Sequence, residues 1–273
     1  MTTIRELAQR FRTLHEQDGA FVIPNPWDVG SARMLTGLGF EALATTSAGF
    51  AWTLGRLDGQ VSRDEKLDHC RAICAAVDVP VSADLENGFG HEPDAVADLI
   101  RHAAETGLVG GSIEDYSGGA DGYIYEFDLA VERIQAAVEA VRGLNTPFFL
   151  TARAENLLRG KTDLDDTIRR LQAFEQAGAD SLYAPALRTL DEVRQVVSSV
   201  TRPLNVLGPM VENASVDELA DAGAKRISVG GALARAALGG LFSAADDLQR
   251  GGFSWLRGAA SGAEITRHLD PLH

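Results

Sequence analysis

The stretch Val79-Pro80-Val81-Ser82-Ala83-Asp84, which continues as Leu85-Glu86-Asn87-Gly88-Phe89-Gly90, carries the signal that decides the fold. It is a short apolar run that ends in two carboxylates and a glycine-rich turn. A strand buried on both faces of a parallel sheet has this composition, because helices cover each side of it. The carboxylates therefore predict a polar site just past the end of a buried strand.

The same unit recurs along the chain. Helix-period segments separate the apolar runs, and several begin with a capping signal such as Ser62 followed by Glu65, or end in a glycine. We expect strands at residues 21–24, 42–46, 80–84, 111–114, 148–151, 181–183, 204–207 and 226–229. The helices between them include residues 64–76, 93–106, 128–142, 163–177, 190–199 and 216–222.

Eight alternations of strand and helix predict a (β/α)8 TIM barrel. No G-x-G-x-x-G follows the first run, so a dinucleotide-binding sheet has no support. We expect one domain over residues 1–273, with the barrel at about 18–240 and a C-terminal helical extension at about 241–273. Phe253, Trp255 and Leu256 make this extension more apolar than a free tail needs, so it should pack on the barrel or on another subunit.

Composition narrows the class of protein. The 273 residues carry a net charge of −14, which argues against a nucleic-acid partner because a phosphate backbone needs a basic surface. No apolar run is long enough to cross a membrane, and no secretory signal is evident. Cys70 and Cys74 are the two cysteines, spaced as small core residues of one helix. A cytoplasmic protein with no membrane partner is expected.

Active sites of such barrels lie at the carboxyl ends of the strands. Polar or small residues follow most of the expected strands, and the barrel should bring them to one mouth. The candidates are Asn25, Trp27, Asp28, Ser47, Ala48, Gly49, Asp58, Asp84, Glu86, Glu114, Asp115, Arg153, Glu155, Tyr183, Asn205, Gly230 and Gly231.

Several carboxylates at one mouth would repel one another, and a hard cation such as Mg²⁺ or Mn²⁺ relieves this repulsion. We expect Asp84 to ligate the ion directly and Glu86 and Glu114 to reach it through water. The planar guanidinium of Arg153 can grip a substrate carboxylate. The backbone N–H groups of Ser47–Gly49 can donate to a carboxylate or to an enolate oxygen.

Structural readings of the same residues stay open. Glu86 can shape the turn at Asn87-Gly88, and Glu114 can end a strand. Arg153 can form a structural ion pair with Glu155. Asp58 can be a solvated loop charge, and Tyr183 suits packing better than catalysis.

Five motifs together resemble the isocitrate lyase and phosphoenolpyruvate mutase superfamily over residues of about 18–240. They are Asn25-Pro26-Trp27-Asp28, Thr45-Thr46-Ser47-Ala48-Gly49, residues 84–90, Ser112-Ile113-Glu114-Asp115 and Thr151-Ala152-Arg153-Ala154-Glu155. The resemblance implies a Mg²⁺-dependent barrel that acts on 2-oxo acids through an enolpyruvate-like oxyanion. It also implies an oligomer, usually a tetramer built as a dimer of dimers, with C-terminal helices exchanged between subunits.

The resemblance also implies roles for individual residues. Ser47, Ala48 and Gly49 would bind the substrate carboxylate and oxo oxygen, with Trp27, Asp58 and Asn205 as further substrate contacts. The metal shell would consist of Asp58, Asp84, Glu86 and Glu114. Arg153 would sit on the substrate, and with Glu114 it would belong to the catalytic group.

The loop at residues 116–125, here called the lid loop, departs from the superfamily pattern. The lyases carry a Lys-Lys-Cys-Gly-His run there, and its cysteine is the general acid; this loop has no Cys, Lys or His. Two interpretations of this loop stay open: Tyr123 or Tyr125 closes over the site and donates the proton, or the aromatic ring is only a plug and water supplies the proton. In addition, Glu86 stands where many members have Asp, and Ala184-Pro185 replaces a polar contact.

These observations favour a Mg²⁺-dependent carbon–carbon lyase for a small 2-oxo or 2-hydroxy di- or tricarboxylate, which reacts through an enolate. One alternative is a P–C bond hydrolase or mutase of the same superfamily, although the lid loop lacks the cations that a phosphoryl group needs. Another is a non-catalytic, Mg²⁺-dependent binder of 2-oxo acids.

Overall fold

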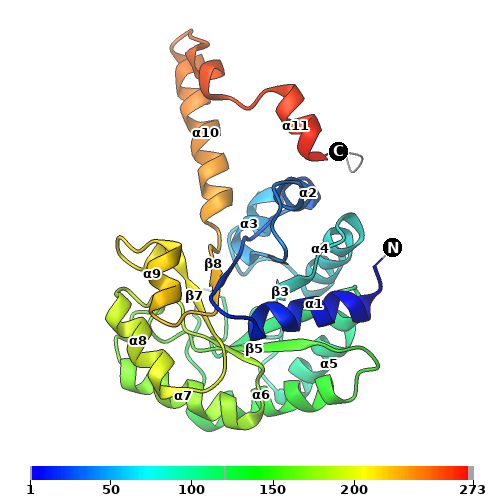
Figure 1. Ribbon diagram of the computed structural model, residues 1–273, viewed down its shortest axis with the longest axis vertical. Coiled ribbons are helices and arrows are strands. Elements are labelled where there is room, and N and C mark those ends of the chain that lie inside the picture. Colours follow the sequence, from blue (N-terminus) through cyan, green and yellow to red (C-terminus); the bar gives the residue numbers. More distant parts are fainter. Residues whose placement is uncertain (1, 120, 270–273) are drawn as a thin grey trace.

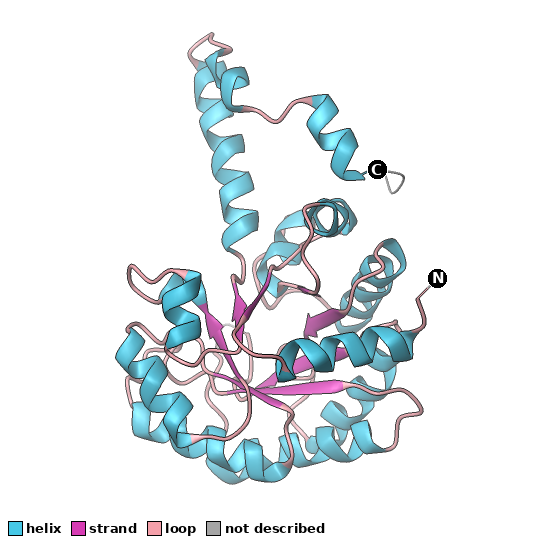
Figure 2. Ribbon diagram, in the orientation of Figure 1, coloured by secondary structure: helices cyan, strands magenta, loops and turns pink. Residues whose placement is uncertain are grey.

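The computed structural model describes residues 2–119 and 121–269, so Ala120 of the lid loop and the last four residues of the predicted extension lie outside it. Eight parallel strands form one sheet in the order β1-β8-β7-β6-β5-β4-β3-β2 (Figures 1 and 2). Where β1 and β2 meet, the Ala44 N–H donates to the Pro24 carbonyl at 3.1 Å, which brings the two edges together. The prediction of a TIM barrel is confirmed.

The strands are short and mostly buried, as a core of parallel strands requires. Their bounds are β1 Phe21–Ile23, β2 Leu43–Ala44, β3 Val81–Asp84, β4 Gly110–Glu114, β5 Phe149–Arg153, β6 Ser181–Tyr183, β7 Leu204–Leu207 and β8 Arg226–Ser228. The clearest difference from expectation is β2, which is two residues long instead of five. It stops early because Thr46 caps the next helix, with its side chain accepting from the Gly49 N–H.

Helices follow the strands around the barrel. Their bounds are α1 Ile4–Glu16, α2 Val29–Gly37, α3 Ser47–Thr53, α4 Arg63–Ala76, α5 Pro93–Ala104, α6 Phe127–Arg142, α7 Leu164–Ala177, α8 Leu190–Ser199, α9 Val216–Asp221, α10 Ala232–Gln249 and α11 Gly262–Leu269, with 3-10 turns η1 Gly208–Met210 and η2 Ser254–Gly258. The expected capping box is present at Ser62 and Glu65, so the local sequence sets where α4 starts. None of the described helices is both long and apolar enough to cross a membrane.

Helix α1 packs at the amino-terminal end of the strands, opposite the expected mouth. Phe11 packs edge-on against Phe149, the first residue of β5, and the His15 ring stacks on Phe149 with centroids 4.1 Å apart. Burial, with help from the nearby Arg226, lowers the pKa of His15 to about 3. His15 is therefore a neutral core residue at this end of the barrel.

Helix α10 projects away from the barrel (Figure 1), and Ala234 is the one buried residue recorded for it in the described chain. After η2 the chain turns back, and α11 lies against α2, where the Arg33 guanidinium donates to the Leu269 carbonyl. The described part of the extension thus contacts the barrel helices at its far end. Along its length it exposes apolar side chains, which are Leu241, Phe242, Leu248, Phe253, Leu256 and Ile265.

Candidate active site

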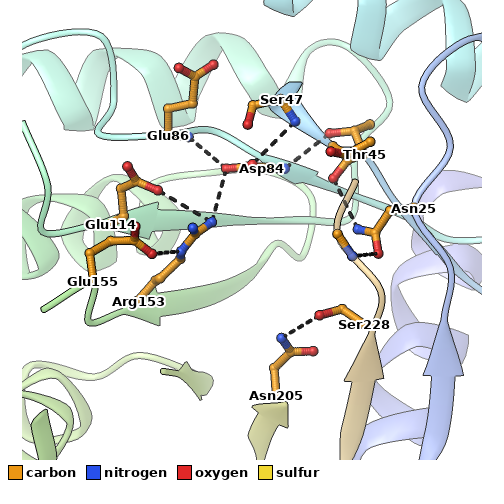
Figure 3. Close-up of polar contacts among 12 residues, drawn as sticks. Asn25, Thr45, Ser47, Asp84, Glu86, Glu114, Arg153, Glu155, Asn205 and Ser228 are labelled. Carbon is orange, nitrogen blue, oxygen red and sulfur yellow. Dashed lines mark hydrogen bonds and ion pairs between the residues drawn. The ribbon is translucent and has the colours of Figure 1, made fainter. Parts of the chain in front are cut away.

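Strands β3, β4 and β5 place three charged residues side by side at the carboxyl end of the barrel (Figure 3). In the sheet register Asp84 lies opposite Ser112, and Glu114 opposite Arg153. Two adjoining cavities open around them. The inner one lies in the barrel axis and is lined by residues that include Asn25, Thr45, Asp84, Arg153, Tyr183, Asn205 and Ser228. The outer one, at the mouth, is lined by Ser47, Asp58, Gly59, Glu86, Glu114, Tyr116, Gly118, Gly119, Arg153 and Arg159.

Arg153 lies at the centre of the cluster. Its Nη1 is 3.7 Å from Asp84 Oδ1 and 3.4 Å from Glu114 Oε2, and its Nε donates to Glu155. Although burial opposes the charge, Glu155 and Glu114 hold the pKa of Arg153 well above its usual value. The sequence left two interpretations of Arg153 open, a structural ion pair with Glu155 and a place at the mouth. Arg153 does both.

Asp84 and Glu114 respond differently to this shared environment. Burial, reinforced by Glu155 and Asp84, raises the pKa of Glu114 well above the ordinary carboxyl value. Burial acts on Asp84 too, but Arg153 and Lys66 outweigh it and lower the pKa of Asp84. The Asp84 carboxylate also accepts from the N–H groups of Ser47 and Glu86. The cluster thus holds an excess of negative charge that a cation would relieve.

The donor set fits a hydrated divalent cation. Within the described residues no three acidic, histidine or cysteine side chains are close enough together to ligate one ion directly. Mg²⁺ commonly takes one or two carboxylates and keeps several waters, so this spacing suits it. Asp84 lines the inner cavity, and Asp58, Glu86 and Glu114 line the outer one, so all four carboxylates face the same mouth.

The segment 47–49 is only partly available to a substrate. The Ser47 N–H points at Asp84 Oδ2, at 3.4 Å, and the Gly49 N–H is taken by the cap residue Thr46. Ala48 and Gly49 line neither cavity of the described chain. A Cβ on Gly49 would come within 2.8 Å of the Trp27 Cβ, so this glycine permits close packing of α3.

Trp27 lies away from both cavities. Its side chain lines an apolar groove against α3 and α10, together with Trp52 and Leu238. We therefore propose no substrate contact for Trp27. Its neighbour Asp28 caps α2 by accepting from the Ser31 N–H at 2.7 Å, a structural task.

Two asparagines of the inner cavity are engaged in cross-strand hydrogen bonds. Asn25 Oδ1 accepts from the N–H groups of Val229 and Gly230 and so joins β1 to the turn after β8. Asn205 donates to Ser228 Oγ at 3.0 Å and accepts from Arg226 Nε at 2.9 Å. Both side chains line the cavity, but their polar atoms already have partners.

Asp115 and Glu155 support the mouth from behind. Asp115 accepts from the Glu155 N–H at 2.7 Å and pairs with Arg170 at 3.0 Å, and burial raises its pKa to about 6. The fully buried Glu155 in turn contacts both Arg153 and Arg159. These two acids position the arginines of the mouth.

The lid tyrosines do not lie where the sequence led us to expect them. Tyr125 is fully buried, its hydroxyl is 2.8 Å from His91 Nδ1, and its ring lies 4.3 Å from the Arg133 guanidinium carbon. Tyr123 is exposed, and neither tyrosine is among the described residues that line the inner or the outer cavity. The reason is a backbone bridge between Tyr116 and Ile124, which folds the loop on itself and turns Tyr125 inward.

Two charged residues at or next to the mouth, Arg159 and Lys66, were missed at the level of the sequence. Arg159 follows Glu155 by one turn, lies 3.1 Å from it and stands 3.7 Å from the ring of Tyr116. Lys66 comes from α4 and reaches Glu86 at 3.1 Å. A signal for Lys66 was present, because it shares a helix face with Cys70 and Ile73, where a lysine is unusual.

Comparison with known proteins fixes the family. The model of the family described as phosphoenolpyruvate phosphomutase matches residues 11–249. The chain belongs to this family. Membership of the isocitrate lyase and phosphoenolpyruvate mutase superfamily, which the five motifs predicted, is thereby confirmed.

The proteins that are similar to this chain include enzymes with a stated activity and proteins without one. A solved structure from Burkholderia cenocepacia J2315, whose description reads lyase/mutase, is 55% identical with a TM-score of 0.93, covering 97% of this chain and 95% of that one. The uncharacterized protein Rv1998c of Mycobacterium tuberculosis is 33% identical over 81% of each chain. A 2-methylisocitrate lyase of Halalkalibacterium halodurans is 28% identical over 73% of this chain and 67% of its own. The predicted kinship with carbon–carbon lyases is confirmed.

Proposed function

We propose that this chain is a Mg²⁺-dependent lyase that breaks a carbon–carbon bond in a small 2-oxo or 2-hydroxy di- or tricarboxylate through an enolate. The observation that carries the proposal is the position of Arg153, which lies among the carboxylates of Asp84, Glu114 and Glu155 at the mouth of the barrel. This arrangement supplies a fixed cation for a substrate carboxylate next to a set of oxygen ligands for a metal ion.

The roles follow from the geometry. Asp84, Glu86, Glu114 and Asp58 would hold Mg²⁺ or Mn²⁺, which when bound stabilises the negative charge that develops on the oxo oxygen. Arg153 would orient the substrate carboxylate, and Glu155 keeps the guanidinium in place. Of the lid-loop tyrosines, Tyr116 lines the mouth, so it replaces Tyr123 and Tyr125 as our candidate proton donor.

Arg159 would hold a second carboxylate of the substrate. It lines the mouth cavity, its side chain is 36% exposed, and that of Arg153 is only 13% exposed. The stacked Tyr116 ring and the Glu155 carboxylate fix the plane of its guanidinium. Two arginines at one mouth favour a substrate with more than one carboxylate.

The test is a proton and phosphorus NMR time course with Mg²⁺, repeated with EDTA. The panel contains oxaloacetate, citramalate, dimethylmalate, isocitrate, methylisocitrate and phosphonopyruvate. EDTA-sensitive release of a 2-oxo acid or other carboxylate from one carbon compound would support the lyase, and Asp84→Asn should abolish it. The matched control is Asp68→Asn, which removes an exposed carboxylate of α4 and should leave the rate of release unchanged.

The same experiment separates the alternatives. Turnover of phosphonopyruvate alone would favour P–C bond chemistry over a carbon–carbon lyase. Mg²⁺-dependent broadening of substrate lines without any product would favour a 2-oxo-acid binder. Neither turnover nor broadening with the whole panel would contradict the assignment of this mouth as the active site.

We also propose a homo-oligomer, a dimer of dimers in which C-terminal helices are exchanged. The support is an apolar groove between α3 and α10, lined by Trp52, Leu238 and Phe242, beside the exposed apolar residues of α10. An exposed apolar face of this kind marks a protein interface. A cytoplasmic location, consistent with the free thiols of Cys70 and Cys74, completes the proposal.

A further inference from the structure

Helix α4 places a buried lysine behind Glu86, one of the acidic residues of the mouth. The Lys66 side chain is 0% exposed, and its Nζ lies 3.1 Å from Glu86 Oε1. Lys66 lines neither of the two cavities within the described residues, so Glu86 stands between it and the open mouth. In Figure 3 the Glu86 carboxylate points away from Arg153. Asp84 therefore faces Arg153, whereas Glu86 faces Lys66.

Among the residues that the structure describes, no second carboxylate lies at ion-pair distance from the Lys66 ammonium. Around it lie Cys70 on the next turn of α4 and the Phe50 ring, whose centroid is 6.0 Å from Nζ. In the described chain, Glu86 is the carboxylate recorded within ion-pair distance of Nζ. Removing an ammonium from water is unfavourable, so a buried lysine needs a partner of opposite charge.

The geometry of this pair decides which charges lie beside the mouth. A lysine ammonium and a glutamate carboxylate 3.1 Å apart form an ion pair. The pair therefore places one positive charge beside the proposed metal ligands.

The loop that carries Glu86 is held rigidly from the other side. Glu86 has a left-handed backbone with φ of 53°, which a residue with a side chain adopts only when its surroundings enforce it. The buried Arg133 donates to the carbonyls of Asn87, Gly90 and His91. With its backbone fixed, the Glu86 side chain has few ways to leave Lys66.

We propose that Lys66 pairs with the Glu86 carboxylate and thereby offsets one negative charge of the divalent-cation shell. It thereby keeps cation binding weaker than four free carboxylates would make it. The inference rests on the proposed cation site, but not on which reaction the site performs. An ammonium close to a divalent ion repels it, so removing the ammonium should tighten binding.

The test measures Mn²⁺ affinity, by the electron paramagnetic resonance signal of free Mn²⁺, without any substrate. Lys66→Met keeps the length of the side chain and removes the charge, and it should tighten Mn²⁺ binding by about tenfold or more. Cys70→Ala is the matched control, because it alters a buried side chain on the same face of α4 without changing charge. Its affinity should stay within about twofold of that of the unmodified chain.

A charge-balanced pair of variants makes the result specific. Glu86→Gln alone leaves the ammonium without a partner and should weaken Mn²⁺ binding by more than about tenfold. Lys66→Met combined with Glu86→Gln removes both charges and should return the affinity to within about threefold of the original. The double variant also keeps the inference testable if the single variant Lys66→Met does not fold. It leaves neither the Lys66 nor the Glu86 charge buried without its partner.

Two outcomes overturn the inference. Lys66 is only a packing residue if Lys66→Met leaves the Mn²⁺ affinity unchanged or weakens it, or if the double variant binds as poorly as Glu86→Gln. If the unmodified chain binds no Mn²⁺, or if Asp84→Asn does not weaken binding, the cation site itself is wrong and the proposed function fails with it.

Discussion

Arg153 contacts carboxylates from β3, β4 and the loop after β5, and it still borders both cavities. Its ion pairs hold the planar guanidinium in place, which lowers the entropy lost when a substrate carboxylate binds. Arg159 uses the same buried anchor, Glu155, and is more exposed. At the residue scale the mouth is therefore a pair of arginines held by one acid.

Arg159→Gln tests the proposed contact to a second carboxylate. Loss of a charge-assisted hydrogen bond costs about 1.5–3 kcal/mol, so kcat/KM for a dicarboxylate should fall by about 10- to 100-fold, mainly through KM. Steady-state kinetics would measure this. Arg169→Gln, an exposed arginine on α7, should leave both constants unchanged, and equal losses in the two variants would contradict the assignment.

His15 makes folding sensitive to acid. Burial lowers its pKa to about 3 in the folded chain, below the unfolded value of about 6.5. The unfolded state therefore binds the proton first, and stability is complete above the unfolded pKa and falls as the pH drops below it. Between pH 7.5 and pH 5.5 this residue alone should cost about 1.4 kcal/mol of unfolding free energy.

Urea unfolding of the unmodified chain and of His15→Gln at both pH values measures this cost. The variant loses ring stacking and should be less stable at each pH, but the difference between its two pH values should be smaller by about that amount. An identical pH difference in the two proteins would show that His15 is not buried in its neutral form.

At the scale of elements, the loop after β4 behaves as a folded hairpin. The Tyr116–Ile124 bridge and the hydrogen bond from the Tyr125 N–H to the Asp115 carbonyl tie its two ends together. Asn87, from the loop after β3, donates to the Ser117 carbonyl at 2.8 Å and to the Tyr125 hydroxyl at 3.3 Å. The lid loop and the loop that carries Glu86 thus form one connected unit.

Tyr125→Phe and Tyr123→Phe should separate the two tyrosines. Tyr125→Phe removes the hydroxyl that contacts Asn87 and His91 and should lower stability by about 1 kcal/mol. Tyr123 is 55% exposed, so the same change there should cost less than about 0.5 kcal/mol. Chemical denaturation measures both, and a greater loss for Tyr123→Phe would contradict this structure of the loop.

At the scale of the whole molecule, the C-terminal extension exposes apolar side chains that the barrel of the same chain does not cover. Helix α10 leaves the barrel with its apolar residues exposed, and Phe242 is 67% exposed beside the groove that contains Trp52. Burying one such side chain is worth roughly 1.5–3 kcal/mol, so several of them can drive assembly. The C-terminal extension is therefore the segment in which to test for an oligomer interface.

Phe242→Glu should dissociate the assembly, because it replaces an apolar contact with a charge that must be desolvated. Sedimentation equilibrium should show a tetramer for the unmodified chain and a smaller species for the variant. Val216→Glu, at an exposed apolar position on α9, is the matched control and should keep the tetramer. If the unmodified chain is a monomer, the proposal of exchanged helices is wrong.

The barrel and the position of its mouth follow from the sequence because they rest on local signals. Apolar runs of four or five residues, capping boxes and terminal glycines are all short-range features, and most expected strands and helices were found within one or two residues. The acidic residues at the carboxyl ends of β3 and β4 were identified for the same reason, since these ends of parallel strands meet at one face.

Contacts between distant segments depended on the tertiary structure. Lys66 lies 20 positions before Glu86, and its partner is set by the packing of α4 against β3. Trp27 and Tyr125 carried plausible motifs, yet the packing of α10 and the bridge in the lid loop turned them away from the mouth. The sequence by itself determined the barrel and its acidic mouth, through short-range patterns. Which charges meet there was decided only by three-dimensional packing, because ion pairs form between side chains that the fold brings together.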